Sequence, residues 1–264
     1  MRLGWIGCGN MAAAMIEGIL KKQLAQPEDI LASDRSAAAR ERAVSLGVTA
    51  KVDNQKVAME ADILVVAVKP QFYGAVFDEI RECRKNGQIT VTIAPGISLE
   101  WTEQHLGAPA KIVRTMPNTP AMVGEGLTAV CCNANVSSKE FETVCGLLEG
   151  FGRVEQIPER LMDVAVSVGS SSPAYVFLMI EAMADGAVAD GMPRELAYRV
   201  AAQAVLGSAR MVLETGRHPG ELKDMVCSPG GTTVAAVRSL ERGNFRGCVM
   251  EAVHVCTEKA RHMV

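Results

Sequence analysis

The chain has 264 residues, of which 48% are apolar and 4% aromatic, and its formal net charge is −3. This length allows one large domain or two ordinary ones, each with an aliphatic core. The small net charge, without any basic block, excludes nucleic acid as an expected partner, and no apolar run is predicted to be long enough to span a bilayer.

Up to about residue 157, short β-type runs alternate with amphipathic segments. The first run leads straight into a glycine loop and not into the cleavage pattern of a secretory leader, so we expect a cytoplasmic protein. Continuous apolar runs suit strands that are buried on both faces of a parallel sheet. The predicted strands are Arg2–Ile6, Ile30–Ser33, Ile63–Val68, Ile89–Ile93, Lys111–Arg114, Leu127–Cys131 and Val154–Ile157, and the helices between them include Met11–Lys22, Ser36–Leu46, Gln71–Cys83 and Lys139–Phe151.

After about residue 160 the strand signals stop, and Gly- and Pro-containing turns separate helical segments. These segments are rich in Ala, Val and Met, which favours burial of part of their surface against a second subunit. A self-contained helical bundle is the alternative. The predicted helices are Pro173–Asp190, Arg194–Thr215, Gly220–Val226, Thr233–Arg242 and Phe245–His262.

A dinucleotide-binding pattern, Gly7-Cys8-Gly9-Asn10-Met11-Ala12, follows the first strand and opens a helix. Gly7 allows the tight turn, Gly9 lets the backbone approach a pyrophosphate, and Asn10 and Met11 present N–H groups at the helix N-terminus. A glycine turn with a purely structural role is the alternative. The pattern predicts an α/β Rossmann-type N-terminal domain with a mostly parallel sheet over residues 1–160, followed by an all-α domain over residues 161–264.

The residues at the end of the second strand, Ser33–Ser36, include one typical of NAD binding and others typical of NADP binding. Asp34 is the kind of residue that takes the ribose hydroxyls of NAD, whereas Arg35 with Ser33 and Ser36 suits the 2′-phosphate of NADP. Asp34 would repel that phosphate unless its carboxylate points away. We predict NADP, with NAD as the open alternative.

Two further strand ends are expected at the same crevice. The run Ala67-Val68-Lys69-Pro70 ends one strand, and Lys69 is either a phosphate or substrate ligand or a solvated loop lysine. Asn118, between Pro117 and Pro120, offers a donor and an acceptor where a nicotinamide would lie. A stiff connector without a ligand role is the alternative for this loop.

The eight cysteines show neither C-x-x-C nor any zinc-site spacing, so no metal site is predicted. His254 and His262 have no third ligand near them in the sequence. We interpret the cysteines as small apolar side chains. A reactive thiol at Cys227 is the alternative, but no His or Lys lies within three residues to lower its pKa.

The turn Cys227-Ser228-Pro229-Gly230-Gly231-Thr232-Thr233 lies between two predicted helices. Because it opens onto a helix N-terminus, its backbone N–H groups can hold an anion such as a carboxylate. A plain helix connection, with Thr232 or Thr233 as the N-cap, is the alternative.

The second domain offers few groups for acid catalysis. After residue 160 the only lysines are Lys223 and Lys259, and Tyr175 is the one candidate acid near Gly169–Pro173, with a buried core tyrosine as the alternative. Reduction of a C=O bond calls for a positioned acid, whereas a cyclic imine arrives protonated or is protonated through water. Positioning of a charged substrate group is then the main requirement, and the turn at 228–233 can supply it.

These motifs resemble those of the pyrroline-5-carboxylate reductase family over essentially the whole chain. The resemblance rests on Ile6–Met11, Ala67–Pro70, Arg114–Pro120 and Gly169–Phe177, and above all on His218–Thr233. It implies reduction of 1-pyrroline-5-carboxylate to L-proline by NAD(P)H, with a preference for NADPH in most members. It also implies a helical substrate-binding and dimerisation domain, dimers that often assemble into decamers, and a site shared across the dimer.

The resemblance further implies that the substrate carboxylate binds at Ser228–Thr233, with Thr233 beside the ring nitrogen. From the turn itself we expect the backbone N–H groups of Gly230, Gly231, Thr232 and Thr233 to hold that carboxylate. Two other hypotheses stay open from the residues alone. A β-hydroxyacid dehydrogenase would share the fold plan but lacks its expected lysine here. A non-catalytic dinucleotide sensor would bind the cofactor without turnover.

Overall fold

The computed structural model describes residues 1–262, and the chain forms two compact units. One unit comprises Met1–Ser171 together with the C-terminal segment from Val255, and the other comprises Ser172–His254. The predicted division at 160/161 differs from these units, because Met162, Val166 and Ala260 bury their side chains in the core of the first unit. A functional division at 160/161 stays a prediction.

The first unit is built on one eight-stranded sheet in the order β3-β2-β1-β4-β5-β6-β7-β8. All neighbouring strands are parallel except β6 and β7, which pair antiparallel. The predicted mostly parallel α/β sheet is therefore confirmed. The strands are β1 (Leu3–Ile6), β2 (Ile30–Ser33), β3 (Thr49–Lys51), β4 (Ile63–Val66), β5 (Ile89–Thr92), β6 (Lys111–Met116), β7 (Gly126–Cys132) and β8 (Gly152–Gln156).

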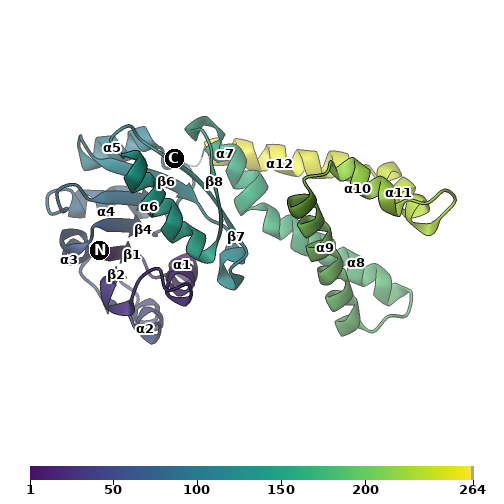
Figure 1. The fold of residues 1–264 in the computed structure, drawn as a ribbon, viewed down its shortest axis with the longest axis horizontal. Coiled ribbons are helices and arrows are strands. Elements are labelled where there is room, and N and C mark those ends of the chain that lie inside the picture. The colour runs from purple at the N-terminus through teal and green to yellow at the C-terminus, as the bar shows by residue number, and fades with distance from the viewer. Residues whose placement is uncertain (263–264) are drawn as a thin grey trace. The chain divides into compact units, whose positions relative to one another are not determined.

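Helices cover both faces of this sheet, and each face has its own core (Figure 1). Along β4, Ile63 and Val65 belong to one core, whereas Leu64 and Val66 belong to the other, as the alternation of side chains along a strand requires. The first core packs against α1, α2 and α6, and the second against α3, α4, α5 and α7. These helices are α1 (Asn10–Lys21), α2 (Ala37–Ser45), α3 (Asn54–Glu60), α4 (Tyr73–Ile80), α5 (Leu99–Leu106), α6 (Ser138–Leu148) and α7 (Met162–Ala165).

Short irregular helices connect these elements. A π-helical turn, η6 (Val166–Ser170), directly follows α7, and π-helical turns are often found at functional sites. The 3₁₀ turns are η1 (Pro27–Asp29), η2 (Pro70–Phe72), η3 (Thr119–Val123), η4 (Glu149–Phe151) and η5 (Glu159–Leu161).

The second unit is entirely helical, and many of its large apolar side chains are exposed. Phe177 and Leu178 are 61% and 67% exposed on one helix, and Leu213 is 61% exposed on the next. A chain with so much exposed aliphatic surface is expected to bury it against another protein surface. The helices are α8 (Ser172–Ala189), α9 (Arg194–Thr215), α10 (Pro219–Val226), α11 (Thr232–Arg242) and α12 (Phe245–Arg261), of which α12 ends in the first unit.

One helical stretch, Glu159–Ala189, is long and apolar enough to cross a membrane by length and composition alone. The expectation that no such run exists was wrong, because isolated acidic residues such as Glu181 interrupt the apolar run without making the segment polar on average. Little of this stretch is buried within the chain. Exposed apolar surface of this kind also suits a helix that packs against a second subunit.

Candidate functional site: a dinucleotide crevice and a helix N-terminus

A cavity of about 360 Å³ lies at the carboxyl ends of β1, β2 and β4. Ligands of open parallel sheets bind at this edge. Seven of the predicted cofactor residues line the cavity, namely Gly7, Gly9, Ser33, Arg35, Ala67, Val68 and Lys69.

The two glycines of the first loop have different physical roles. Gly7 has φ +99°, and a Cβ there would lie 2.6 Å from the backbone oxygen of Ala67. Only glycine therefore fits between β1 and β4 at this point. A Cβ on Gly9 would meet no protein atom within 4 Å, so Gly9 keeps open space beside the start of α1.

The start of α1 is suited to an anion. Gly9 is its N-cap and supplies no side-chain acceptor, and the first turn carries no acidic residue. Its first N–H groups are thus available to a phosphate, and the helix dipole adds to them. The residues present fit the pyrophosphate of a dinucleotide.

Both oxygens of the Asp34 carboxylate accept hydrogen bonds from backbone N–H groups. One oxygen accepts from the Cys8 backbone N–H at 2.7 Å, and the other accepts from the Ser36 N–H at 2.8 Å. The carboxylate therefore braces the glycine loop against the end of β2. The two N–H donors partly compensate the negative charge of Asp34, which reduces its repulsion of a 2′-phosphate beside Arg35.

The side chain of Cys8 is buried in the core of the first unit. The thiol is 2% exposed, and burial, with a smaller contribution from Asp34, raises the pKa of Cys8 to about 12. Its backbone N–H donates to Asp34, so that group is not free for a cofactor contact.

A partly buried hydrogen-bond chain leads from Ser33 to α4. The Ser33 hydroxyl donates to Asn54 Oδ1 at 2.7 Å, and Asn54 Nδ2 donates to Glu79 Oε2 at 2.8 Å. Because Ser33 is fully buried, its hydroxyl serves this chain before any ligand. Asn54 lines the cavity and was not predicted, since the short exposed strand β3 that precedes it gives no clear pattern.

The lining of the cavity differs from the predicted set of cofactor residues in two ways. Sequence reasoning did not find the apolar wall formed by Phe72, Ala75 and Val76. The spacing of these residues along α4 and the turn before it could have indicated them. The predicted residues outside the lining are Cys8, Asn10, Met11, Pro70 and Asn118.

Asn118 is held by the protein at both ends of its amide. Its Oδ1 accepts from the Leu127 backbone N–H at 2.8 Å, and its Nδ2 donates to the Gly169 carbonyl at 2.9 Å. Asn118 thereby joins β7 to the π-helical turn. The contact with a nicotinamide stays a prediction, and these bonds give the side chain a structural role.

The turn at 227–233 has the geometry of an uncapped helix start. Ser228 O accepts from Gly231 N at 3.0 Å, and Gly230 has φ +71°, which closes a tight turn after Pro229. The expected alternative, a threonine N-cap, was wrong: Gly231 is the N-cap of α11 and supplies no side-chain acceptor.

This start leaves N–H groups available at Thr232 and Thr233, with no acidic residue in the first turn. The Gly231 N–H is committed to the turn itself, so it is not free for a ligand. A Cβ on Gly231 would lie 2.4 Å from Ser228 Oγ and 3.1 Å from the Ser228 backbone oxygen, so any larger residue would require Ser228 to shift. Within the described residues there is no group of three or more His, Cys, Asp or Glu side chains that could hold a metal ion.

Two family models match the chain. Residues 159–263 match the model described as pyrroline-5-carboxylate reductase dimerisation, and residues 2–96 match the one described as NADP oxidoreductase coenzyme F420-dependent. The first match covers most of the predicted all-α domain, and the second covers the strands that line the cavity.

Full-length relatives agree with these models. The chain is 46% identical over 266 residues to pyrroline-5-carboxylate reductase of Escherichia coli strain K12, covering 99% of this chain and 98% of that protein. It is 38% identical over 263 residues to pyrroline-5-carboxylate reductase of Methanosarcina acetivorans, covering 99% and 97%. Among solved structures, Plasmodium falciparum pyrroline carboxylate reductase with NADP bound is 33% identical with a TM-score of 0.91, covering 100% of this chain and 98% of that chain.

Proposed function

The chain belongs to the pyrroline-5-carboxylate reductase family, and from this premise we propose that it reduces 1-pyrroline-5-carboxylate to L-proline with NADPH. The observation that carries the proposal is full-length identity of 46% with the Escherichia coli reductase, which spans both the dinucleotide crevice and the turn at 227–233. The β-hydroxyacid dehydrogenase and sensor hypotheses both lose their support, since neither accounts for a match of this extent.

The crevice holds the dinucleotide through its backbone and two cationic side chains. The N-terminus of α1 takes the pyrophosphate, Gly9 leaves room for its approach, and Arg35 takes the 2′-phosphate. Lys69, exposed on the cavity wall, is the second cation within reach of phosphate. When bound, the reduced cofactor supplies the hydride.

The turn at Ser228–Thr233 holds the substrate carboxylate. The N–H groups of Thr232 and Thr233, and that of Gly230, converge with the dipole of α11 on one anionic group. Such positioning is the main demand of imine reduction, because hydride addition neutralises a protonated C=N bond and leaves no alkoxide to protonate.

Thr233 orients the ring nitrogen through its hydroxyl. A threonine hydroxyl is far too weakly acidic to protonate the substrate, so its contribution is a hydrogen bond in the correct direction. Ser228 places a further hydroxyl on the same turn.

The assay is direct. Purified protein is mixed with pyrroline-5-carboxylate and either NADPH or NADH, and oxidation of the nicotinamide is followed together with formation of proline. We expect turnover with both cofactors and a higher kcat/KM for NADPH. Absence of proline with either cofactor would rule out the reaction, and a clear preference for NADH would overturn the role given to Arg35.

The chain forms a homo-oligomer through the domain that matches the dimerisation model. A homodimer is the unit we propose, with the decamer of the family as a further assembly. We also propose a cytoplasmic location, supported by the eight cysteines, all of them free thiols in the structure.

A further inference from the structure

A second cavity of about 360 Å³ lies in the first unit, away from the dinucleotide crevice. It is formed by the connection from α4 to β5 and the connection from α5 to β6. These connections meet at the amino ends of β5 and β6, whereas the dinucleotide crevice lies at the carboxyl ends of β1, β2 and β4. The two cavities share no lining residue.

Arg84 lines this cavity and is a half-buried cation without an anionic partner. Its Nη2 donates to the Leu106 carbonyl at 3.2 Å and its Nη1 to Thr90 Oγ1 at 3.5 Å, both neutral acceptors. Its Nε is buried without a hydrogen-bond partner. Among residues 1–262, no carboxylate lies within 4.0 Å of the Arg84 guanidinium.

Arg114 shows how the same unit treats another buried guanidinium. Arg114 is 4% exposed, and its Nη atoms lie 3.1 Å from Glu159 and 3.3 Å from Asp163. A buried charge is costly unless it is paired, and Arg114 meets that rule with two carboxylates. Among residues 1–262, Arg84 has no carboxylate partner of this kind.

The remaining charged groups of the cavity are mostly cationic. Arg81, Lys85 and Lys111 line it together with Arg84, and among the described residues Glu82 is the one carboxylate in the lining. Glu82 lies 3.6 Å from Arg81 Nε, while Lys85 pairs with Asp62 and Lys111 with Glu140. Those pairs leave Arg84 as the unneutralised charge, and burial lowers the pKa of its guanidinium, as expected for an uncompensated cation.

We propose that this cavity binds a phosphate group, either free phosphate or a small phosphate monoester, against Arg84. The unpaired guanidinium of Arg84, next to three further cationic side chains that have carboxylate partners, favours an anion, and its planar fork suits phosphate oxygens. The volume of the cavity exceeds what one phosphate requires, which leaves room for the alcohol part of an ester. The site is independent of the reductase reaction proposed above.

Phosphate binding is measured by isothermal titration calorimetry on the full-length protein saturated with NADP⁺ and proline, so that the crevice and the turn at 228–233 are both blocked. Inorganic phosphate and glycerol 3-phosphate are titrated separately. We expect saturable binding of at least one of them. Tighter binding of glycerol 3-phosphate would identify an ester as the occupant, and tighter binding of inorganic phosphate would identify the free ion. Failure of both to bind would overturn the proposal.

Variants then assign the binding to Arg84. Arg84→Gln should abolish the titration signal, whereas Arg153→Gln, which removes an exposed arginine on β8, should leave it unchanged. Equal binding by wild type and Arg84→Gln would also contradict the proposal. Because Arg84 bonds the end of α5, each variant is checked for cofactor binding.

A second substitution keeps the test decisive if Arg84→Gln fails to fold. Asn86 is exposed and lines the cavity, so Asn86→Asp adds a carboxylate at constant size. We expect phosphate affinity to fall roughly fivefold through repulsion at short range. Gln23→Glu, an added charge at an exposed position outside the lining, is the matched control. Unchanged affinity in Asn86→Asp would overturn the proposal.

Discussion

At the scale of single residues, the two glycines of the first loop differ in the space around them. Gly7 has a positive φ, and a Cβ there would clash with the backbone of Ala67. Gly9 has an ordinary N-cap φ of −69°, and a Cβ there would meet open space. The same substitution at the two positions therefore has different physical consequences.

We expect Gly7→Ala to lower the free energy of unfolding by about 1–3 kcal/mol, because a Cβ meets backbone and the φ is strained. Gly9→Ala should leave the unfolding midpoint unchanged while raising the KM for NADPH at least tenfold, since its methyl group enters the space of the pyrophosphate. Thermal unfolding and steady-state kinetics on both variants check this. Loss of stability in Gly9→Ala would contradict the assignment.

Thr233 carries the second residue-scale prediction. Thr233→Ala removes one hydroxyl from the start of α11 and leaves the backbone N–H groups in place. We expect kcat/KM for pyrroline-5-carboxylate to fall about 10- to 100-fold, the size of one hydrogen bond to a charged group, with the KM for NADPH nearly unchanged. Thr233→Ser should restore most of the activity. An equal loss toward substrate and cofactor would argue against the role given to Thr233.

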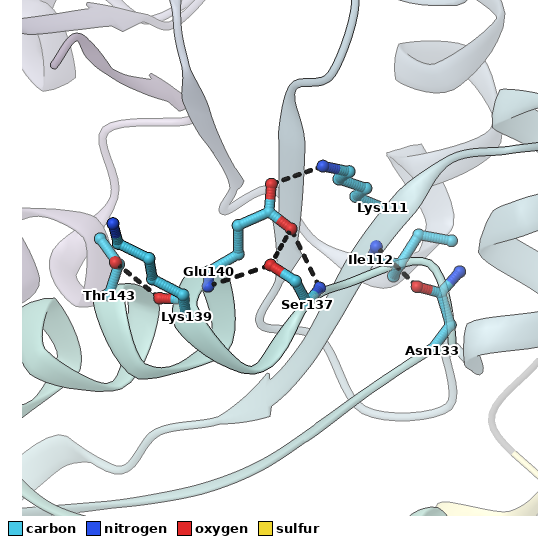
Figure 2. Close-up of polar contacts among 7 residues, drawn as sticks. All are labelled: Lys111, Ile112, Asn133, Ser137, Lys139, Glu140 and Thr143. Carbon is cyan, nitrogen blue, oxygen red and sulfur yellow. Dashed lines mark hydrogen bonds and ion pairs between the residues drawn. The ribbon is translucent and has the colours of Figure 1, made fainter.

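At the scale of secondary-structure elements, helix α6 is fastened to β6 by a charged N-terminal cap (Figure 2). Ser137 is the N-cap, and Glu140 completes a capping box by accepting from the Ser137 N–H at 3.0 Å. The other oxygen of Glu140 pairs with Lys111 at the start of β6. Lys111, followed by the Ser137 contacts, lowers the pKa of Glu140 from 4.5 to about 2.

This lowered pKa predicts a dependence of stability on pH. The folded state binds the proton of Glu140 less readily than the unfolded state, so the contribution of Glu140 is present above pH 4.5 and is lost as the pH falls toward 2. Glu140→Gln keeps a capping-box side chain but removes the charge that pairs with Lys111, so it should lower the free energy of unfolding by about 1 kcal/mol at pH 7. Urea unfolding at several pH values measures the difference, which should shrink below pH 4.5. A difference that stays constant down to pH 2 would contradict this account.

Prediction of the elements themselves was accurate where the pattern was strong. The helix Arg194–Thr215 and the strand Ile30–Ser33 were predicted with their observed bounds, because apolar periodicity and punctuating Gly or Pro residues agree there. Strand β3, in contrast, is a three-residue edge strand with two exposed positions. Because so little of β3 is buried, its sequence shows no alternation of apolar and polar residues, and the strand was not predicted. The place of Asn54 beside the cavity was therefore not predicted either.

At the scale of the whole molecule, the second unit has more apolar surface than a monomer is expected to expose. Leu178 on α8 and Leu213 on α9 are both more than half exposed, and the matched family model describes this region as a dimerisation domain. Burial of such surface is the main favourable term in association.

We expect Leu178→Glu to shift the protein toward monomers, because a carboxylate would have to be desolvated in an apolar interface. Size-exclusion chromatography with light scattering measures the mass, and activity should fall in parallel. Val44→Glu, at an exposed position on α2 in the first unit, is the control and should leave the mass unchanged. A wild-type mass for Leu178→Glu would place the interface elsewhere.

The sequence by itself determined the fold class, the dinucleotide loop and the turn at 227–233, because each depends on local chemistry: glycines where φ is positive, and periodic apolar residues along strands and helices. Tertiary structure decided how the polar groups are used. It turns the Asp34 carboxylate toward the backbone of the glycine loop and uses both ends of the Asn118 amide. It also pairs Arg114 with two carboxylates, whereas Arg84 meets only neutral acceptors in the described part of the chain. These outcomes depend on which segments meet in space, and a pattern along the chain does not contain that information.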